Sequence, residues 1–123
     1  MPVDAPSPPA LDLILVYITT ATPDEARQIG RTLVSERLAA CVNILPGMTA
    51  LYSWEGNLEE TQETVLIAKT RAALFPALAE RVTALHSYST PCLLELPIHR
   101  SLPAYAAWLL AGCQPPPVAT AEK

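Results

Sequence analysis

The sequence predicts a single α+β domain, and three observations lead to this prediction. The chain has 123 residues, which is enough for one hydrophobic core and too few for two comfortable ones. Half of the residues are hydrophobic and 16% are charged, a balance that permits a substantial core. Segments typical of strands alternate with segments whose apolar residues recur at helical spacing. We therefore expect a sheet with helices packed on it.

The first strand and the first helix follow one another at the start of the domain. Residues 11–18 are apolar at both odd and even positions after Asp12, as expected of a strand that is covered on both faces. Thr22 then offers a hydroxyl cap, Pro23 suits the first helical position, and Glu25 stands three residues after the cap. This capping box predicts that a helix begins here.

A long hairpin is predicted next. Residues 41–45 indicate a second strand, which is bent or bulged at 46–47 and continues through 49–54. A turn at 55–57 follows, and the β-branched, apolar run 64–70 returns as the third strand. The arms of this hairpin are long enough to project beyond the domain.

The remaining elements are a second helix, a last strand and a closing helix. Thr70 is expected to cap the second helix, whose apolar residues recur at intervals of four, four and three over 74–85. Residues 92–96 predict the last strand, which Pro97 ends, and apolar residues at helical spacing over 102–109 predict a short C-terminal helix.

The resulting order βαββαβ is that of the ferredoxin-like fold, in which both long helices lie on one face of an antiparallel sheet. The strands nevertheless offer apolar residues to both faces, since Leu13, Leu15 and Tyr17 alternate with Ile14, Val16 and Ile18. We expect no further element in so short a chain to cover the second face. An apolar patch of that size predicts self-association.

Composition argues against several classes of protein. The net charge of −4 and the lack of a basic run argue against nucleic acid as a partner, and charged residues interrupt every stretch that could span a membrane. No P-loop, GxSxG, HExxH, GxGxxG or CxxC motif is present, so no enzymatic activity is expected. Prolines crowd both ends, which predicts disordered tails at 1–10 and 113–123 around a domain at 11–112.

The cysteines favour free thiols. Cys41, Cys92 and Cys113 are an odd number at wide spacing, and the chain start lacks the pattern of a secretory signal. A reducing cytoplasm is therefore the expected location. Cys113, beside the predicted tail, is expected to be the most exposed of the three.

Several strings, in a collinear order from about residue 12 to 110, resemble the CutA divalent-cation tolerance family. They are Glu36-Arg37-Leu38-Ala39-Ala40-Cys41-Val42-Asn43-Ile44, Pro46-Gly47, Tyr52-Ser53-Trp54-Glu55-Gly56, Lys69-Thr70, His86-Ser87-Tyr88, Pro91 and Tyr105-Ala106-Ala107-Trp108-Leu109. The resemblance implies a homotrimer of ferredoxin-like subunits, similar in architecture to the PII signalling proteins and linked to tolerance of copper and other divalent metals. It also implies that the long hairpins pair with neighbouring subunits, which would give Tyr52 and Trp54 apolar partners.

His86 and Cys92 are the candidate metal ligands, for copper or another divalent cation bound weakly. An imidazole and a thiolate suit copper. His86 has the alternative of interacting with a helix C-terminus, and Cys92 that of a small buried residue. Ser87 and Cys92 stand where many family members have a proline and an acidic residue, and of the imidazole and thiolate ligands of some bacterial members only His86 is retained.

The other candidate residues would line a cleft or an interface. Tyr88 and Trp108 are expected to pack there, and Lys69 is expected to pair with a glutamate such as Glu95 or to hold an anion. Carboxylates gather around the hairpin turn, where we expect a solvated loop with weak affinity for hard cations; they are Glu55, Glu59, Glu60 and Glu63. An alternative function is a PII-like signalling or scaffold trimer whose clefts bind a small anionic ligand or a protein partner, which Lys69 and Arg71 would favour.

Overall fold

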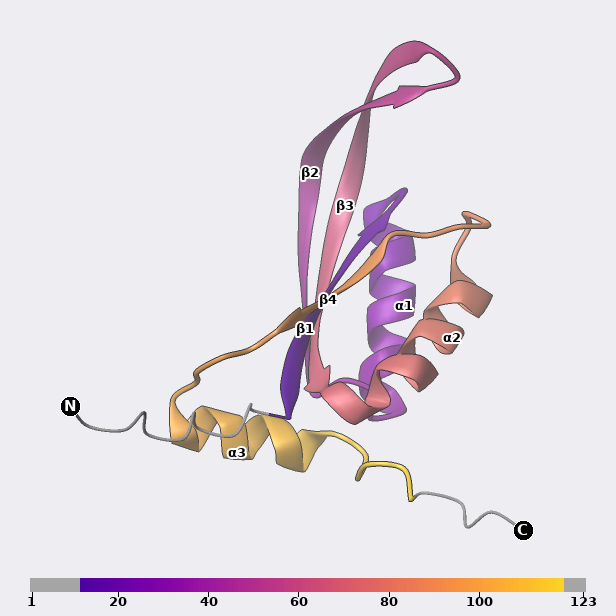
Figure 1. Ribbon diagram of the computed structural model, residues 1–123. Helices are drawn as coiled ribbons and strands as arrows, with labels where there is room; N and C mark the ends of the chain where they lie inside the picture. Colours follow the sequence, from indigo (N-terminus) through magenta and orange to yellow (C-terminus); the bar gives the residue numbers. More distant parts are fainter. Residues whose placement is uncertain (1–11, 119–123) are drawn as a thin grey trace, which may run out of the picture.

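The structure, a computed structural model, describes residues 12–118, and its element order is the predicted one (Figure 1). The elements are β1 (Leu13–Thr20), α1 (Pro23–Ser35), β2 (Cys41–Trp54), β3 (Asn57–Arg71), a short 3₁₀ turn η1 (Ala72–Leu74), α2 (Phe75–Leu85), β4 (Leu93–Pro97) and α3 (Pro103–Gly112). The tail predicted at 1–10 and the last five residues lie outside the described part. Within it, no helix has the length and apolar character needed to cross a membrane.

One four-stranded antiparallel sheet, in the order β2-β3-β1-β4, forms the centre of the molecule. Helices α1 and α2 lie together on one of its faces (Figure 1). Ile14, Val16 and Ile18 of β1 point to this face and are fully buried against both helices, with Leu33 and Leu78 among their neighbours. The ferredoxin-like prediction is therefore confirmed, and this face holds the main core.

The predicted capping box starts α1. The Thr22 hydroxyl accepts a hydrogen bond from the Glu25 backbone N–H at 3.1 Å, and the Glu25 carboxylate accepts one from the Ala21 N–H at 2.9 Å. The first bond satisfies an N–H group in the first turn of the helix, and the second satisfies the N–H of the residue just before the cap. Pro23 occupies the first turn, as predicted.

The hairpin of β2 and β3 is longer than the sequence suggested, because β3 begins at Asn57 rather than at residue 64. Residues 58–63 include five polar side chains at exposed or half-exposed positions, so they lack the apolar run by which the strand was recognised. The register slips between Leu45 and Met48, which is the predicted bulge. Glu55 and Gly56 form the tip with φ of 50° and 83°, typical of a tight two-residue hairpin turn.

Thr70 does not cap the second helix, contrary to the prediction. It lies within β3, fully buried, and its hydroxyl donates to the Leu38 carbonyl at 2.6 Å. The helix begins instead through the 3₁₀ turn η1, with Pro76 in its first turn. The spacing of apolar residues predicted the position of the helix correctly, but the Thr70 hydroxyl forms a hydrogen bond between distant segments of the chain instead of capping the helix.

The expectation that no element covers the second face is partly wrong, because α3 packs on one end of it. Leu109 and Cys113 bury themselves there against Leu13 and Leu74. Cys113, expected to be the most exposed cysteine, is only 2% exposed. The packed chain thus continues past residue 112.

Two arginines fasten the end of α3. Arg37 donates to the carbonyls of Ala111 and Cys113, both at 2.9 Å, and Arg71 donates to the carbonyl of Leu110 at 3.3 Å. These contacts satisfy carbonyls that a helix end leaves without partners.

The close packing of the end of α3 against Ala40 gives a first prediction. A Cβ added at Gly112 would lie 2.8 Å from the Cβ of Ala40, so Gly112→Ala should lower the free energy of unfolding by about 1–3 kcal/mol. Urea unfolding measures the loss. Ala40→Gly removes the opposing carbon, so the double variant should recover most of the stability; strictly additive effects of the two changes would contradict this packing.

Candidate functional site

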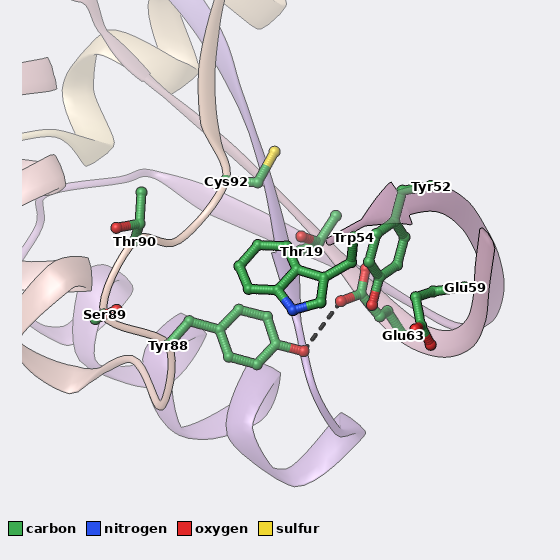
Figure 2. Close-up of a pocket in the computed structure, with 9 residues that line it drawn as sticks. All are labelled: Thr19, Tyr52, Trp54, Glu59, Glu63, Tyr88, Ser89, Thr90 and Cys92. Carbon is green, nitrogen blue, oxygen red and sulfur yellow. Dashed lines mark hydrogen bonds between the residues drawn. The ribbon is translucent and has the colours of Figure 1, made fainter. Parts of the chain in front are cut away.

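A hollow of about 740 Å³ lies where the hairpin leaves the sheet (Figure 2). Its walls come from the ends of β1 and β2, from β3, and from the segment between α2 and β4. The lining residues are Thr19, Tyr52, Trp54, Glu59, Glu63, Tyr88, Ser89, Thr90 and Cys92. Four predicted site residues, Tyr52, Trp54, Tyr88 and Cys92, are therefore brought together from positions up to forty residues apart.

The hairpin places two of its carboxylates on one face. Glu59 and Glu63 are four residues apart in a strand, so their side chains share a side with Tyr52, which pairs with Glu59. Glu60 lies between them and points to the opposite side. The sequence analysis grouped these three glutamates in a solvated loop, and the missed signal was the alternation along β3.

Tyr88 connects the loop between α2 and β4 to the hairpin. Its hydroxyl donates a hydrogen bond to the Glu63 carboxylate at 3.0 Å (Figure 2). Burial, and then this bond to an anion, raise the pKa of Tyr88 to about 12. The phenol therefore remains protonated at neutral pH and keeps Glu63 in place.

His86 does not line the hollow but contacts the segment between α2 and β4 from its buried side. Its ring is fully buried, with Nε2 lying 2.8 Å from the Thr19 carbonyl and Nδ1 accepting the Tyr88 backbone N–H at 3.0 Å. Since a carbonyl only accepts, Nε2 carries the proton and neither nitrogen has a free lone pair. Metal ligation by His86 would require one of these contacts to open, and that role stays a prediction.

Glu25 ties the same loop to the start of α1. Besides capping Ala21, its carboxylate accepts the Ser87 backbone N–H at 2.6 Å. Burial alone raises the pKa of Glu25, but the hydrogen bonds from Ala21 and Ser87 outweigh it and hold the pKa below its ordinary value of 4.5. One carboxylate thus fixes both a helix start and a wall of the hollow.

Cys92 is half-buried at the edge of the hollow with a free thiol. Together with Glu59 and Glu63 it supplies one soft and two hard donors for a cation. Within residues 12–118, however, no three His, Cys, Asp or Glu side chains lie close enough to form a metal cluster. The described part of the chain therefore offers separate donors and no complete coordination shell.

Lys69 and Trp108 lie outside the hollow. Lys69 donates to the Tyr105 hydroxyl at 3.2 Å, and Tyr105 in turn stacks on Trp108 with ring centroids 5.5 Å apart. The expected pairing with Glu95 is wrong within the chain, because Lys69 lies opposite Leu15 whereas Glu95 lies opposite Val16, so they occupy different faces of the sheet. An interface role for Lys69 and Trp108 stays a prediction.

These features define a ferredoxin-like α+β protein with an acidic, aromatic hollow beside an extended hairpin. The sequence profile of the CutA1 divalent ion tolerance protein family matches residues 14–111. The chain is 48% identical over 95 residues to the divalent-cation tolerance protein CutA of Thermus thermophilus, covering 77% of this chain and 92% of that protein. It is 41% identical over 96 residues to the chloroplastic protein CutA of Arabidopsis thaliana, covering 78% of this chain and 53% of that protein.

Solved structures agree with this match. The divalent cation tolerance protein of Thermus thermophilus superposes with a TM-score of 0.81 at 45% identity, covering 83% of this chain and 99% of that one. CutA1 from Oryza sativa superposes with a TM-score of 0.82 at 38% identity, covering 85% of this chain and 96% of that one. The chain therefore belongs to the CutA1 divalent ion tolerance protein family. This family is named for tolerance of divalent ions and not for an enzymatic activity.

The Glu25 contacts give a prediction about acid stability. Because the folded-state pKa is lowered, the carboxylate stabilises the fold above pH 4.5, and this contribution disappears as the pH falls through the folded-state value. Glu25→Gln should lower the free energy of unfolding by about 1–3 kcal/mol at pH 7, and the difference from wild type should shrink towards pH 3. Urea unfolding across this range measures both. Asp24→Asn, at the neighbouring exposed carboxylate, is the control; a pH-independent effect of Glu25→Gln would contradict the assignment.

Proposed function

We propose that this protein acts as a homotrimer that binds copper or another divalent cation weakly and contributes to the response to metal ions. The observation that carries the proposal is the gathering of Cys92, Glu59 and Glu63 around one hollow. Membership of a divalent ion tolerance family supports it.

The donor set explains why weak binding is expected. A thiol favours copper, and carboxylates accept most divalent cations. Since one subunit lacks a cluster of three ligands among the described residues, water or a neighbouring subunit would have to fill the remaining positions. Of the two ligands predicted from the sequence, Cys92 is proposed as a direct one, whereas His86 would need its hydrogen bonds to open.

The open part of the sheet supports self-association. Leu94 and Leu96 of the edge strand β4 are 56% and 45% exposed, next to half-buried Leu15 and Tyr17 on the same face. Apolar area of this kind on a soluble protein is typical of an interface. The number of three subunits follows the family resemblance, which also implies that hairpins pair between subunits and cover Tyr52 and Trp54.

Among the residues that the structure describes, no specific contact favours the alternative of an anion-binding signalling trimer. The Lys69 ammonium donates to Tyr105, and the Arg71 guanidinium is engaged by Asp12 and by carbonyls at the end of α3. The cytoplasmic location expected from the sequence stays a prediction.

Assembly can be tested on the open face. Light scattering should give about three times the chain mass of 13.2 kDa. Leu94→Glu together with Leu96→Glu should shift the protein to monomers, because two charges would be buried without partners. Ala84→Glu on the exposed side of α2 is the control and should leave the mass unchanged; a wild type of 13.2 kDa would contradict the trimer.

Metal binding can be tested by calorimetric titration with copper and zinc. Cys92→Ser and Glu63→Gln should each weaken copper binding about tenfold, or about 1.4 kcal/mol. Glu60→Gln removes the same charge from the other side of β3 and should bind copper as wild type does. If Cys92→Ser and Glu63→Gln bound copper with the same affinity as Glu60→Gln and wild type, the hollow would not be the metal site. Unchanged affinity in His86→Ala would restrict His86 to holding the loop.

A further inference from the structure

The two oxygens of the Glu63 carboxylate have different surroundings. Oε2 accepts the hydrogen bond from the Tyr88 hydroxyl at 3.0 Å (Figure 2). Among residues 12–118, Oε1 accepts no hydrogen bond, and no lysine, arginine or histidine forms an ion pair with this carboxylate. A free carboxylate can offer both oxygens to a cation. The bond from Tyr88 therefore leaves Oε1 as the oxygen that is readily available.

Tyr88 can impose this arrangement because its own position is fixed from the opposite side. Its backbone N–H donates to Nδ1 of the buried His86 ring at 3.0 Å, and the centroids of the two rings lie 4.9 Å apart. The preceding residue, Ser87, donates its N–H to the Glu25 carboxylate. All of these contacts lie within one chain, and none involves the hairpin rings that the proposed assembly covers. The phenol is thus a fixed donor, to which the more flexible Glu63 side chain adjusts.

Divalent cations differ in what they require of a carboxylate. Calcium takes about six to eight oxygen ligands and can use both oxygens of one carboxylate. Copper binds a given set of ligands more tightly than other first-row divalent ions do, and it gains from a thiolate, which suits a hard cation such as calcium poorly. Engaging one oxygen of Glu63 therefore weakens calcium binding more than copper binding, because Cys92 in the same wall still serves copper.

We propose that Tyr88 determines the cation specificity of the hollow: by holding Oε2 of Glu63, it restricts this carboxylate to one oxygen and disfavours calcium relative to copper. The inference rests on the proposed function, because it names which divalent cation the same site selects. Tyr88 does not touch the cation and acts through Glu63, so it is a positioning residue. Loss of its hydroxyl frees the second oxygen for calcium.

The test is a copper titration of the full chain in excess calcium, with excess magnesium at the same ionic strength as the reference. Magnesium keeps several waters and gains little from a second carboxylate oxygen. Wild type should bind copper equally in both. Tyr88→Phe keeps the ring and the backbone contacts, so only the hydroxyl is lost. In this variant calcium should weaken copper binding at least about fivefold relative to magnesium, which corresponds to about 1 kcal/mol.

Further variants check that the effect passes through Glu63. In a Glu63→Gln background, adding Tyr88→Phe should leave the ratio of the two copper affinities unchanged, because no carboxylate remains to be released. Tyr105→Phe removes a hydroxyl that accepts from Lys69 outside the hollow and should behave as wild type does. Circular dichroism checks that each variant is folded.

The outcomes separate this proposal from the metal function. Copper binding that calcium leaves unchanged in Tyr88→Phe would overturn the specificity role alone. The same conclusion would follow if Tyr88→Phe lowered the ratio equally in the Glu63→Gln background. Failure of wild type to bind copper at all would instead overturn the proposed function, and the specificity role with it.

Discussion

The structure depends on one constraint: the sheet has two apolar faces, and residues 12–118 fully cover only one of them. Ile14, Val16 and Ile18 meet α1 and α2 and are sealed. On the other face, α3 covers the end at Leu13 and stops short of Leu94 and Leu96. Arg37 and Arg71 hold α3 in that position, so it cannot slide to close the gap without losing several hydrogen bonds. The uncovered part and the hollow beside it are consequences of this division.

The hollow exists because distant segments are tied together at its rim. The Glu25 carboxylate, at the start of α1, accepts the backbone N–H of Ser87. The hydroxyl of the next residue, Tyr88, donates a hydrogen bond to Glu63 on the hairpin. Each contact involves a carboxylate, and each lies at the point where a loop would otherwise be free to move. The same residues that end the secondary structure therefore shape the site.

Local chemistry in the sequence predicted most of the elements. The cap at Thr22, the bulge after Leu45 and the turn at Gly56 each depend on residues a few positions apart, and the structure confirms all three. Contacts between distant residues were not accessible in this way. The Thr70 hydroxyl donates to the Leu38 carbonyl, and Cys113 packs against Leu13. The two ring nitrogens of His86 are hydrogen-bonded to the backbone of Thr19 and Tyr88. Residue type alone suggested a cap, an exposed thiol and a free ligand, because the partners that decide these roles lie elsewhere in the chain.

Seven site residues were predicted from the sequence, and the fold brings four of them, Tyr52, Trp54, Tyr88 and Cys92, together around one hollow. Glu63 was expected only as one of four carboxylates in a solvated loop with weak affinity for hard cations, whereas the structure places it within β3 in the wall of the hollow. As a carboxylate it would attract a metal ion together with Cys92, and the Tyr88 hydroxyl occupies part of its hydrogen-bonding capacity, so this one bond both fixes the position of the carboxylate and limits what it can offer to a cation.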